Sequence, residues 1–132
     1  VIVIDFGTAT TFDVLTADRD YIGGIIAPGV ELSAAALFKS AAKLFTIDYS
    51  APPETIVCDN TTDCIKSGLI YGYISLTEGL LQKIITERKF KEPLIIATGG
   101  FGKIITPLTK GINIYDEQIT LKGIKLIYEK NF

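Results

Sequence analysis

The sequence predicts an α/β layer fold with a mixed sheet, and three observations predict it. The first third carries three short apolar segments separated by tight turns, as expected of antiparallel strands. A long middle stretch has apolar residues at helical spacing. The last third alternates short apolar strands with helical segments. The length and the absence of repeats predict a single domain over residues 1–132.

The first third predicts a three-strand antiparallel meander. Residues 1–5 are four apolar β-formers that end at a carboxylate, Asp5. Residues 10–16 form the second predicted strand and residues 21–27 the third. Gly23-Gly24 lies inside this third strand, where glycines mark a bulge or a close backbone approach.

Two helices are predicted in the middle of the chain. Residues 31–43 are rich in Ala and Leu and predict a helix, followed by a surface loop over 45–53. A longer helix is expected from Asn60 or Thr61 to about residue 88, because Asn and Thr are good N-caps. It contains small residues at spacings that let another helix approach, which fits either a subunit interface or packing against the sheet. These are Gly68, Gly72 and Gly79.

The last third predicts two further strand and helix pairs. The strands are expected over residues 93–97 and 112–115, and the helices over 103–108 and 118–129. The closing helix carries lysines balanced by acidic neighbours, as expected of a solvated face. They are Lys122, Lys125 and Lys130.

The composition excludes several function classes. Thirteen basic and fifteen acidic residues give a net charge of -2, which provides no electrostatic case for nucleic-acid binding. No segment approaches the roughly 18 apolar residues that span a bilayer, so no membrane partner is expected. The absence of His excludes His-based catalysis and His metal ligands in this chain. Cys58 and Cys64 are expected to be free thiols in a reducing compartment, with a disulfide as the alternative in an exported protein.

The turn after the first strand is the strongest candidate site. Asp5 could hold a cation, and Gly7 would let a ligand approach closely. The hydroxyls of Thr8, Thr10 and Thr11 could bind phosphate oxygens. The simpler interpretation is that Asp5 caps an ordinary turn. Asp13 is a second acidic candidate in the next strand, but the sequence does not show whether it faces the same side as Asp5.

Two other segments are weaker candidates. Thr98-Gly99-Gly100 follows a buried strand, where ligands gather in open α/β sheets, but such glycines are often only a loop. Asn60-Thr61-Thr62 begins the long helix and could bind an anionic or hydroxylated ligand, or could be a plain N-cap.

Taken in order, four segments resemble type III pantothenate kinases, also called Bvg accessory factor-like proteins. The segments are Asp5-Phe6-Gly7-Thr8-Ala9-Thr10-Thr11, Gly23-Gly24-Ile25-Ile26-Ala27-Pro28-Gly29, Asn60-Thr61 with Ser67-Gly68, and Ala97-Thr98-Gly99-Gly100. The similarity extends over essentially all of the chain and corresponds to the C-terminal half of a family member. It implies a ribonuclease H-like domain of the acetate and sugar kinase, Hsc70 and actin superfamily.

The resemblance also implies an activity and a set of site residues. Family members phosphorylate pantothenate with ATP, the first step of coenzyme A synthesis, as cytoplasmic homodimers. They use Mg²⁺ with the nucleotide and K⁺ or NH₄⁺ as a monovalent cation. By position in the motifs, Asp5 would bind the monovalent cation, Thr8 the ATP phosphates and Thr61 pantothenate. Gly99 and Gly100 would lie near the adenosine of ATP.

The chain departs from the family at its beginning. A complete member has an N-terminal domain with an Asp-x-Gly-Asn-Thr phosphate motif and a Gly-x-Asp-Arg segment that supplies the general base. Neither motif is present; Ala17-Asp18-Arg19 echoes the second but falls in a turn, so no catalytic residue is assigned. The chain has no Met and opens inside a strand, which suggests a C-terminal part of something longer. Alone it is expected to bind poorly and to be inactive.

Two other interpretations stay open. The chain could be a non-enzymatic regulator or binding protein of the same fold. It could also be an unrelated α/β domain whose glycines and threonines are structural.

Overall fold

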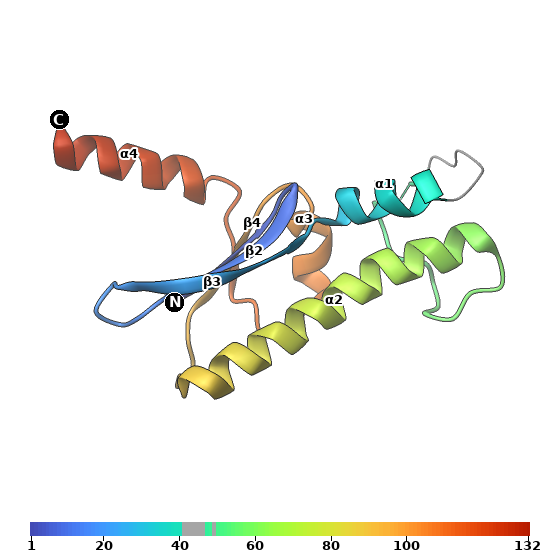
Figure 1. Ribbon diagram of the computed structural model, residues 1–132, viewed down its shortest axis with the longest axis horizontal. Coiled ribbons are helices and arrows are strands. Elements are labelled where there is room, and N and C mark those ends of the chain that lie inside the picture. Colours follow the sequence, from blue (N-terminus) through green and yellow to red (C-terminus); the bar gives the residue numbers. More distant parts are fainter. Residues whose placement is uncertain (41–46, 49) are drawn as a thin grey trace.

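Five strands form one mixed sheet in the computed structural model, which describes residues 1–40, 47–48 and 50–132 (Figure 1). The strands are β1 (Ile2–Phe6), β2 (Ala9–Leu15), β3 (Tyr21–Pro28), β4 (Ile95–Thr98) and β5 (Ile114–Tyr115). Their order across the sheet is β3-β2-β1-β4-β5. β1, β2 and β3 are antiparallel neighbours, whereas β4 is parallel to β1 and β5 is parallel to β4. The predicted meander and mixed sheet are therefore confirmed.

The predicted helices are present in the described part of the chain. They are α1 (Val30–Ser40), α2 (Thr61–Arg88), α3 (Gly102–Ile105) and α4 (Ile119–Asn131). The single helix predicted over residues 103–108 is instead α3 followed by a 3₁₀ turn, Thr106–Leu108, that contains a proline. The end of the helix predicted over 31–43 and part of the loop predicted over 45–53 lie outside the described residues.

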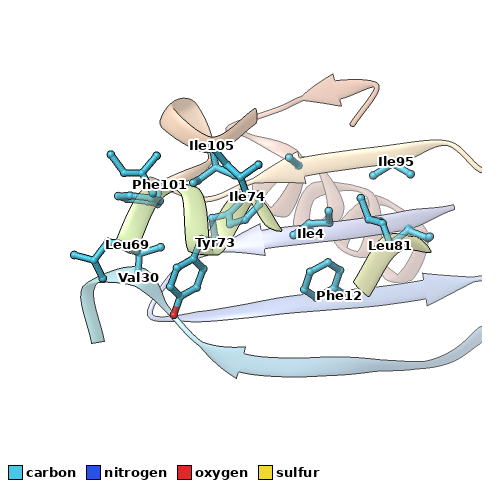
Figure 2. Close-up of a cluster of buried hydrophobic side chains, with 14 of the residues drawn as sticks. Ile4, Phe12, Val30, Leu69, Tyr73, Ile74, Leu81, Ile95, Phe101 and Ile105 are labelled. Atoms are coloured by element: carbon cyan, nitrogen blue, oxygen red, sulfur yellow. The ribbon is translucent and has the colours of Figure 1, made fainter. Parts of the chain in front are cut away.

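The core lies between one face of the sheet and α2 (Figure 2). Alternate residues of β1 and β2 point into it, because successive side chains of a strand face opposite sides. Ile4 and Phe12 are fully buried there. The helix contributes side chains at helical spacing, including Leu69, Ile74 and Leu81. This packing fixes where α2 begins relative to the strands.

The glycine pair of β3 marks both a bulge and a close approach of the neighbouring backbone. The register between β2 and β3 shifts directly after the pair of Val14 with Gly23, and Gly23 has a φ of +116°. A Cβ on Gly24 would overlap the backbone carbonyl of Phe12 in the neighbouring strand. The predicted bulge and close backbone approach are confirmed.

The closing helix α4 lies apart from the sheet (Figure 1). None of its residues is buried, and its predicted lysine face is solvated: Lys122 pairs with Asp116 at 2.6 Å and Lys125 with Glu129 at 3.6 Å. Its large apolar side chains are exposed as well, which the sequence pattern did not indicate. They are Leu121, Ile124, Leu126, Ile127 and Tyr128. Among the described helices, none is long and apolar enough to span a membrane.

Candidate functional site

The candidate site begins where the parallel strands β1 and β4 end side by side. Asp5 near the end of β1 pairs in register with Thr98, the last residue of β4. Gly7 follows the first strand and Gly99 the second, so the structure brings these two sequence motifs together. The carboxyl ends of parallel strands are where α/β sheets bind ligands.

Gly99 is the residue that lets the loop after β4 lie directly against the end of β1. It has a φ of +88°, and a Cβ there would lie 2.6 Å from the carbonyl oxygen of Phe6 and would overlap the Asp5 carboxylate. The Tyr115 hydroxyl donates to the Gly99 carbonyl at 3.0 Å and holds this conformation. The next residue, Gly100, is exposed and has open space around its Cα. Gly99 is therefore required by the backbone, whereas Gly100 is not.

The Asp5 carboxylate is half-buried. Among the described residues, none forms a hydrogen bond or ion pair with it. Burial raises the pKa of Asp5 above its ordinary value, and the Asp13 carboxylate raises it further. The register pairs Asp13 with Val3 and Thr11 with Asp5, so both carboxylates lie on the same face of the sheet. Asp13 therefore faces the same side as Asp5, which the sequence alone did not show.

A bound cation fits this carboxylate better than the simple turn-cap interpretation does. A capping Asp accepts hydrogen bonds from the turn that follows it, and no such bond to Asp5 is present among the described residues. A desolvated carboxylate without a partner is stabilised by an adjacent positive charge. The fit rests on the Asp5 carboxylate, and the backbone carbonyl oxygen of Phe6 lies close by, since both would meet a Cβ on Gly99.

Thr8 lies in the tight turn between β1 and β2. The Gly7 amide donates to the Ala9 carbonyl at 3.1 Å, and the Gly29 amide donates to the Thr8 carbonyl at 3.0 Å. Gly29 fits only because it has no Cβ, which would overlap both turn carbonyls. The Thr8 side chain is left exposed, next to the end of β1 that carries Asp5. It is therefore available to a ligand at this edge of the sheet.

A separate open groove of about 740 Å³ lies between α1 and the first half of α2. Its surface is mainly apolar and includes hydroxyl groups from both helices, and among the described residues no Lys or Arg lines it. The lining residues are Ser33, Leu37, Cys58, Asp59, Asn60, Thr61, Cys64, Ile65, Gly68, Leu69 and Tyr73. The groove therefore suits a small, largely apolar ligand with a few hydrogen-bonding groups.

A chain of hydroxyl groups joins the two walls of the groove. The Tyr73 hydroxyl donates to the Pro28 carbonyl at 2.7 Å and lies 2.6 Å from the Ser33 hydroxyl, which therefore donates to Tyr73. Figure 2 shows the Tyr73 oxygen directed toward the segment that leads from β3 into α1. Sequence reasoning missed both residues, because a Tyr at an apolar helical position indicates only a core residue.

Thr61 is exposed at the start of α2 and lines this groove. Asn60 before it is the N-cap: its side-chain oxygen accepts from the Asp63 amide at 3.0 Å, and its amide donates to the Asp63 carboxylate at 2.8 Å. The plain N-cap interpretation is thus confirmed for Asn60. Asp5 is not among the groove's lining residues, so the predicted sites at Asp5 and Thr61 do not share this groove.

Comparison with known proteins connects these features to a family. A family model described as type III pantothenate kinase matches residues 1–83. Curated relatives of the same name come from Roseiflexus sp. (strain RS-1), 47% identical over 131 residues, and Syntrophus aciditrophicus (strain SB), 43% identical over 130 residues. These alignments cover 99% and 98% of this chain but 51% and 50% of the relatives. The chain therefore spans about half the length of the curated relatives it matches.

A solved structure has a similar fold. It is described as a conserved Baf family transcriptional activator from Campylobacter jejuni and matches with a TM-score of 0.63 at 22% identity. The match covers 98% of this chain and 57% of that chain. At this identity the likeness shows the fold alone.

Proposed function

The chain belongs to the type III pantothenate kinase family, and from this we propose that it forms the C-terminal half of an enzyme that phosphorylates pantothenate with ATP. The product would be 4'-phosphopantothenate, in the first step of coenzyme A biosynthesis. The observation that carries the proposal is the half-buried carboxylate of Asp5 at the adjacent ends of β1 and β4, which has no hydrogen bond or ion pair within the described part of the chain. Phosphoryl transfer depends mainly on positioning and charge neutralisation, which this edge of the sheet can supply.

The proposed roles divide the edge of the sheet between cation and nucleotide. Asp5 would bind a monovalent cation, K⁺ or NH₄⁺, whose charge offsets that of the phosphates. The exposed hydroxyl of Thr8 would donate to ATP phosphate oxygens. Gly99 and Gly100 would lie beside the adenosine, with Gly99 also fixing the loop against Asp5. Mg²⁺ would accompany the ATP phosphates.

The proposed pantothenate site is the groove between α1 and α2. Its apolar surface suits the substrate's geminal methyl groups, and the Thr61 hydroxyl can bond to a polar group. The free backbone amides at the start of α2 favour an anion such as the substrate carboxylate. Among the described residues that line the groove none is basic, so these amides and Thr61 are the groups that we propose to bind that carboxylate.

Further parts of the proposal concern the whole enzyme. The strand order and the antiparallel meander support a ribonuclease H-like domain of the acetate and sugar kinase, Hsc70 and actin superfamily. An N-terminal domain would supply the Asp-x-Gly-Asn-Thr motif and the general base. The whole enzyme would be a cytoplasmic homodimer. The dimer part of this proposal is supported by three glycines of α2 that face open space and would allow a second helix to approach. They are Gly68, Gly72 and Gly79.

The test combines this chain with the N-terminal half of a relative. The N-terminal half of the Roseiflexus relative is fused ahead of this chain, and ADP formation is followed in potassium and then in sodium chloride. We expect turnover that needs both pantothenate and potassium, and Asp5→Asn should abolish the potassium stimulation. Asp18→Asn, in an exposed turn, is the matched control and should retain it. A folded fusion without turnover in either salt would favour a non-enzymatic binding protein.

A further inference from the structure

The only two cysteines of the chain lie together at the start of α2. Cys58 and Cys64 are six residues apart and enclose the N-cap Asn60 and the proposed substrate residue Thr61. Both are free thiols, as the sequence predicted, and both line the groove between α1 and α2. Thiol chemistry at either residue therefore takes place on the surface of the groove.

The Cys64 side chain contacts the backbone of Cys58. The Cys64 thiol donates to the backbone carbonyl of Cys58 at 3.2 Å. The Cys58 thiol donates instead to the Thr55 carbonyl, also at 3.2 Å. The Cys64 sulfur thus lies against the backbone of Cys58, and Cys64 is close enough to influence the Cys58 thiol electrostatically. A disulfide between them requires the Cys58 side chain to exchange its hydrogen bond with Thr55 for a bond to the Cys64 sulfur.

The two thiols differ in accessibility. Cys64 is exposed, whereas Cys58 is partly covered. Burial raises the pKa of the Cys58 thiol, and the neighbouring Cys64 raises it further. Since the thiolate is the reactive form, Cys64 is expected to react first with a dissolved oxidant, and Cys58 to act as the second, resolving thiol.

We propose that Cys58 and Cys64 are a reversible oxidation site that closes to an intramolecular disulfide at the groove when a peroxide is the oxidant. In the first step the Cys64 sulfur is oxidised to a sulfenic acid, and the peroxide is reduced to water or an alcohol. In the second step the Cys58 sulfur attacks the Cys64 sulfur. The S–S bond forms, the S–O bond breaks, and the hydroxyl leaves as water with the Cys58 proton.

The test uses the 132-residue chain itself and does not depend on kinase activity. The folded, reduced chain is treated with hydrogen peroxide, quenched at intervals and analysed by intact mass, thiol titration and peptide mapping. We expect both thiols to be lost in step and the monomer mass to fall by two hydrogens. One peptide pair should link Cys58 to Cys64, and dithiothreitol should restore both thiols.

Two matched variants separate the roles of the thiols. In Cys64→Ser the Cys58 thiol should persist under peroxide, because the first-reacting sulfur is gone. In Cys58→Ser the Cys64 thiol should still be lost but should stop at a sulfenic acid that dimedone traps. Serine can retain the hydrogen bonds to the Thr55 and Cys58 carbonyls, and circular dichroism checks that each variant folds. Independent loss of the two thiols in the unsubstituted chain, or linkage only between molecules, would overturn the proposal.

Discussion

Replacing Gly99 by Ala tests the backbone arrangement that supports Asp5. An L-residue at a φ of +88° is strained, which costs about 1–3 kcal/mol at such sparsely populated conformations. The new Cβ would also lie 2.6 Å from the Phe6 carbonyl oxygen and overlap the Asp5 carboxylate. Displacing packed groups of this kind costs about 1–3 kcal/mol. We therefore expect Gly99→Ala to lower the free energy of unfolding by about 2–6 kcal/mol.

The adjacent glycine provides the matched control for this prediction. Gly100 has no strained φ and no atom near its Cβ position, so Gly100→Ala should change the free energy of unfolding by less than about 0.5 kcal/mol. Both variants are compared with the unsubstituted chain by urea unfolding followed by far-UV circular dichroism. Equal effects of the two substitutions, or an unchanged midpoint for Gly99→Ala, would refute the argument that Gly99 is required by the approach of the two loops.

Three further predictions concern single side chains. Tyr73→Phe should lower the free energy of unfolding by about 1–3 kcal/mol, since the Pro28 carbonyl and the Ser33 hydroxyl lose their partner. Tyr128→Phe, at an exposed tyrosine, is the control and should leave the free energy of unfolding unchanged. Asn60→Ala should cost about 1 kcal/mol by removing the N-cap of α2, measured by the same unfolding assay. The pKa of Asp5 is raised from its ordinary value of 3.8, so the folded chain holds this proton more tightly than the unfolded chain does. The free energy of unfolding should therefore fall as the pH rises from 3.8 through the pKa of Asp5 in the folded chain. Asp5→Asn should remove this loss in urea unfolding across a pH series; an unchanged profile would contradict it.

Much of the fold could be predicted because its signals are local. The apolar segments of β1, β2 and β3 are separated by short turns, which leave adjacent strands little choice but antiparallel pairing. Asn60 marked the start of α2 because its side chain satisfies an amide of the first turn. The glycine pair in β3 indicated a bulge because few other residues tolerate that backbone.

The site was less predictable because its signals are not local. Whether Asp5 and Asp13 share a face depends on the register of β1 and β2, which only the folded sheet defines. The bond between Ser33 and Tyr73 joins residues forty positions apart, and no sequence period indicates it. The predicted sites at Thr61 and Asp5 do not share one groove. This depends on how α1 and α2 pack, since α1 forms one wall of the groove that Thr61 lines.

Direct identification of the reaction product tests the central claim most sharply. The fusion with the relative's N-terminal half is incubated with ATP, Mg²⁺, potassium and pantothenate, and the products are separated and identified by mass spectrometry. We expect 4'-phosphopantothenate in amounts equal to the ADP formed, and none when Asp5→Asn is tested at the same potassium concentration. Formation of ADP with inorganic phosphate alone, or no phosphorylated pantothenate from a folded fusion, would contradict this expectation.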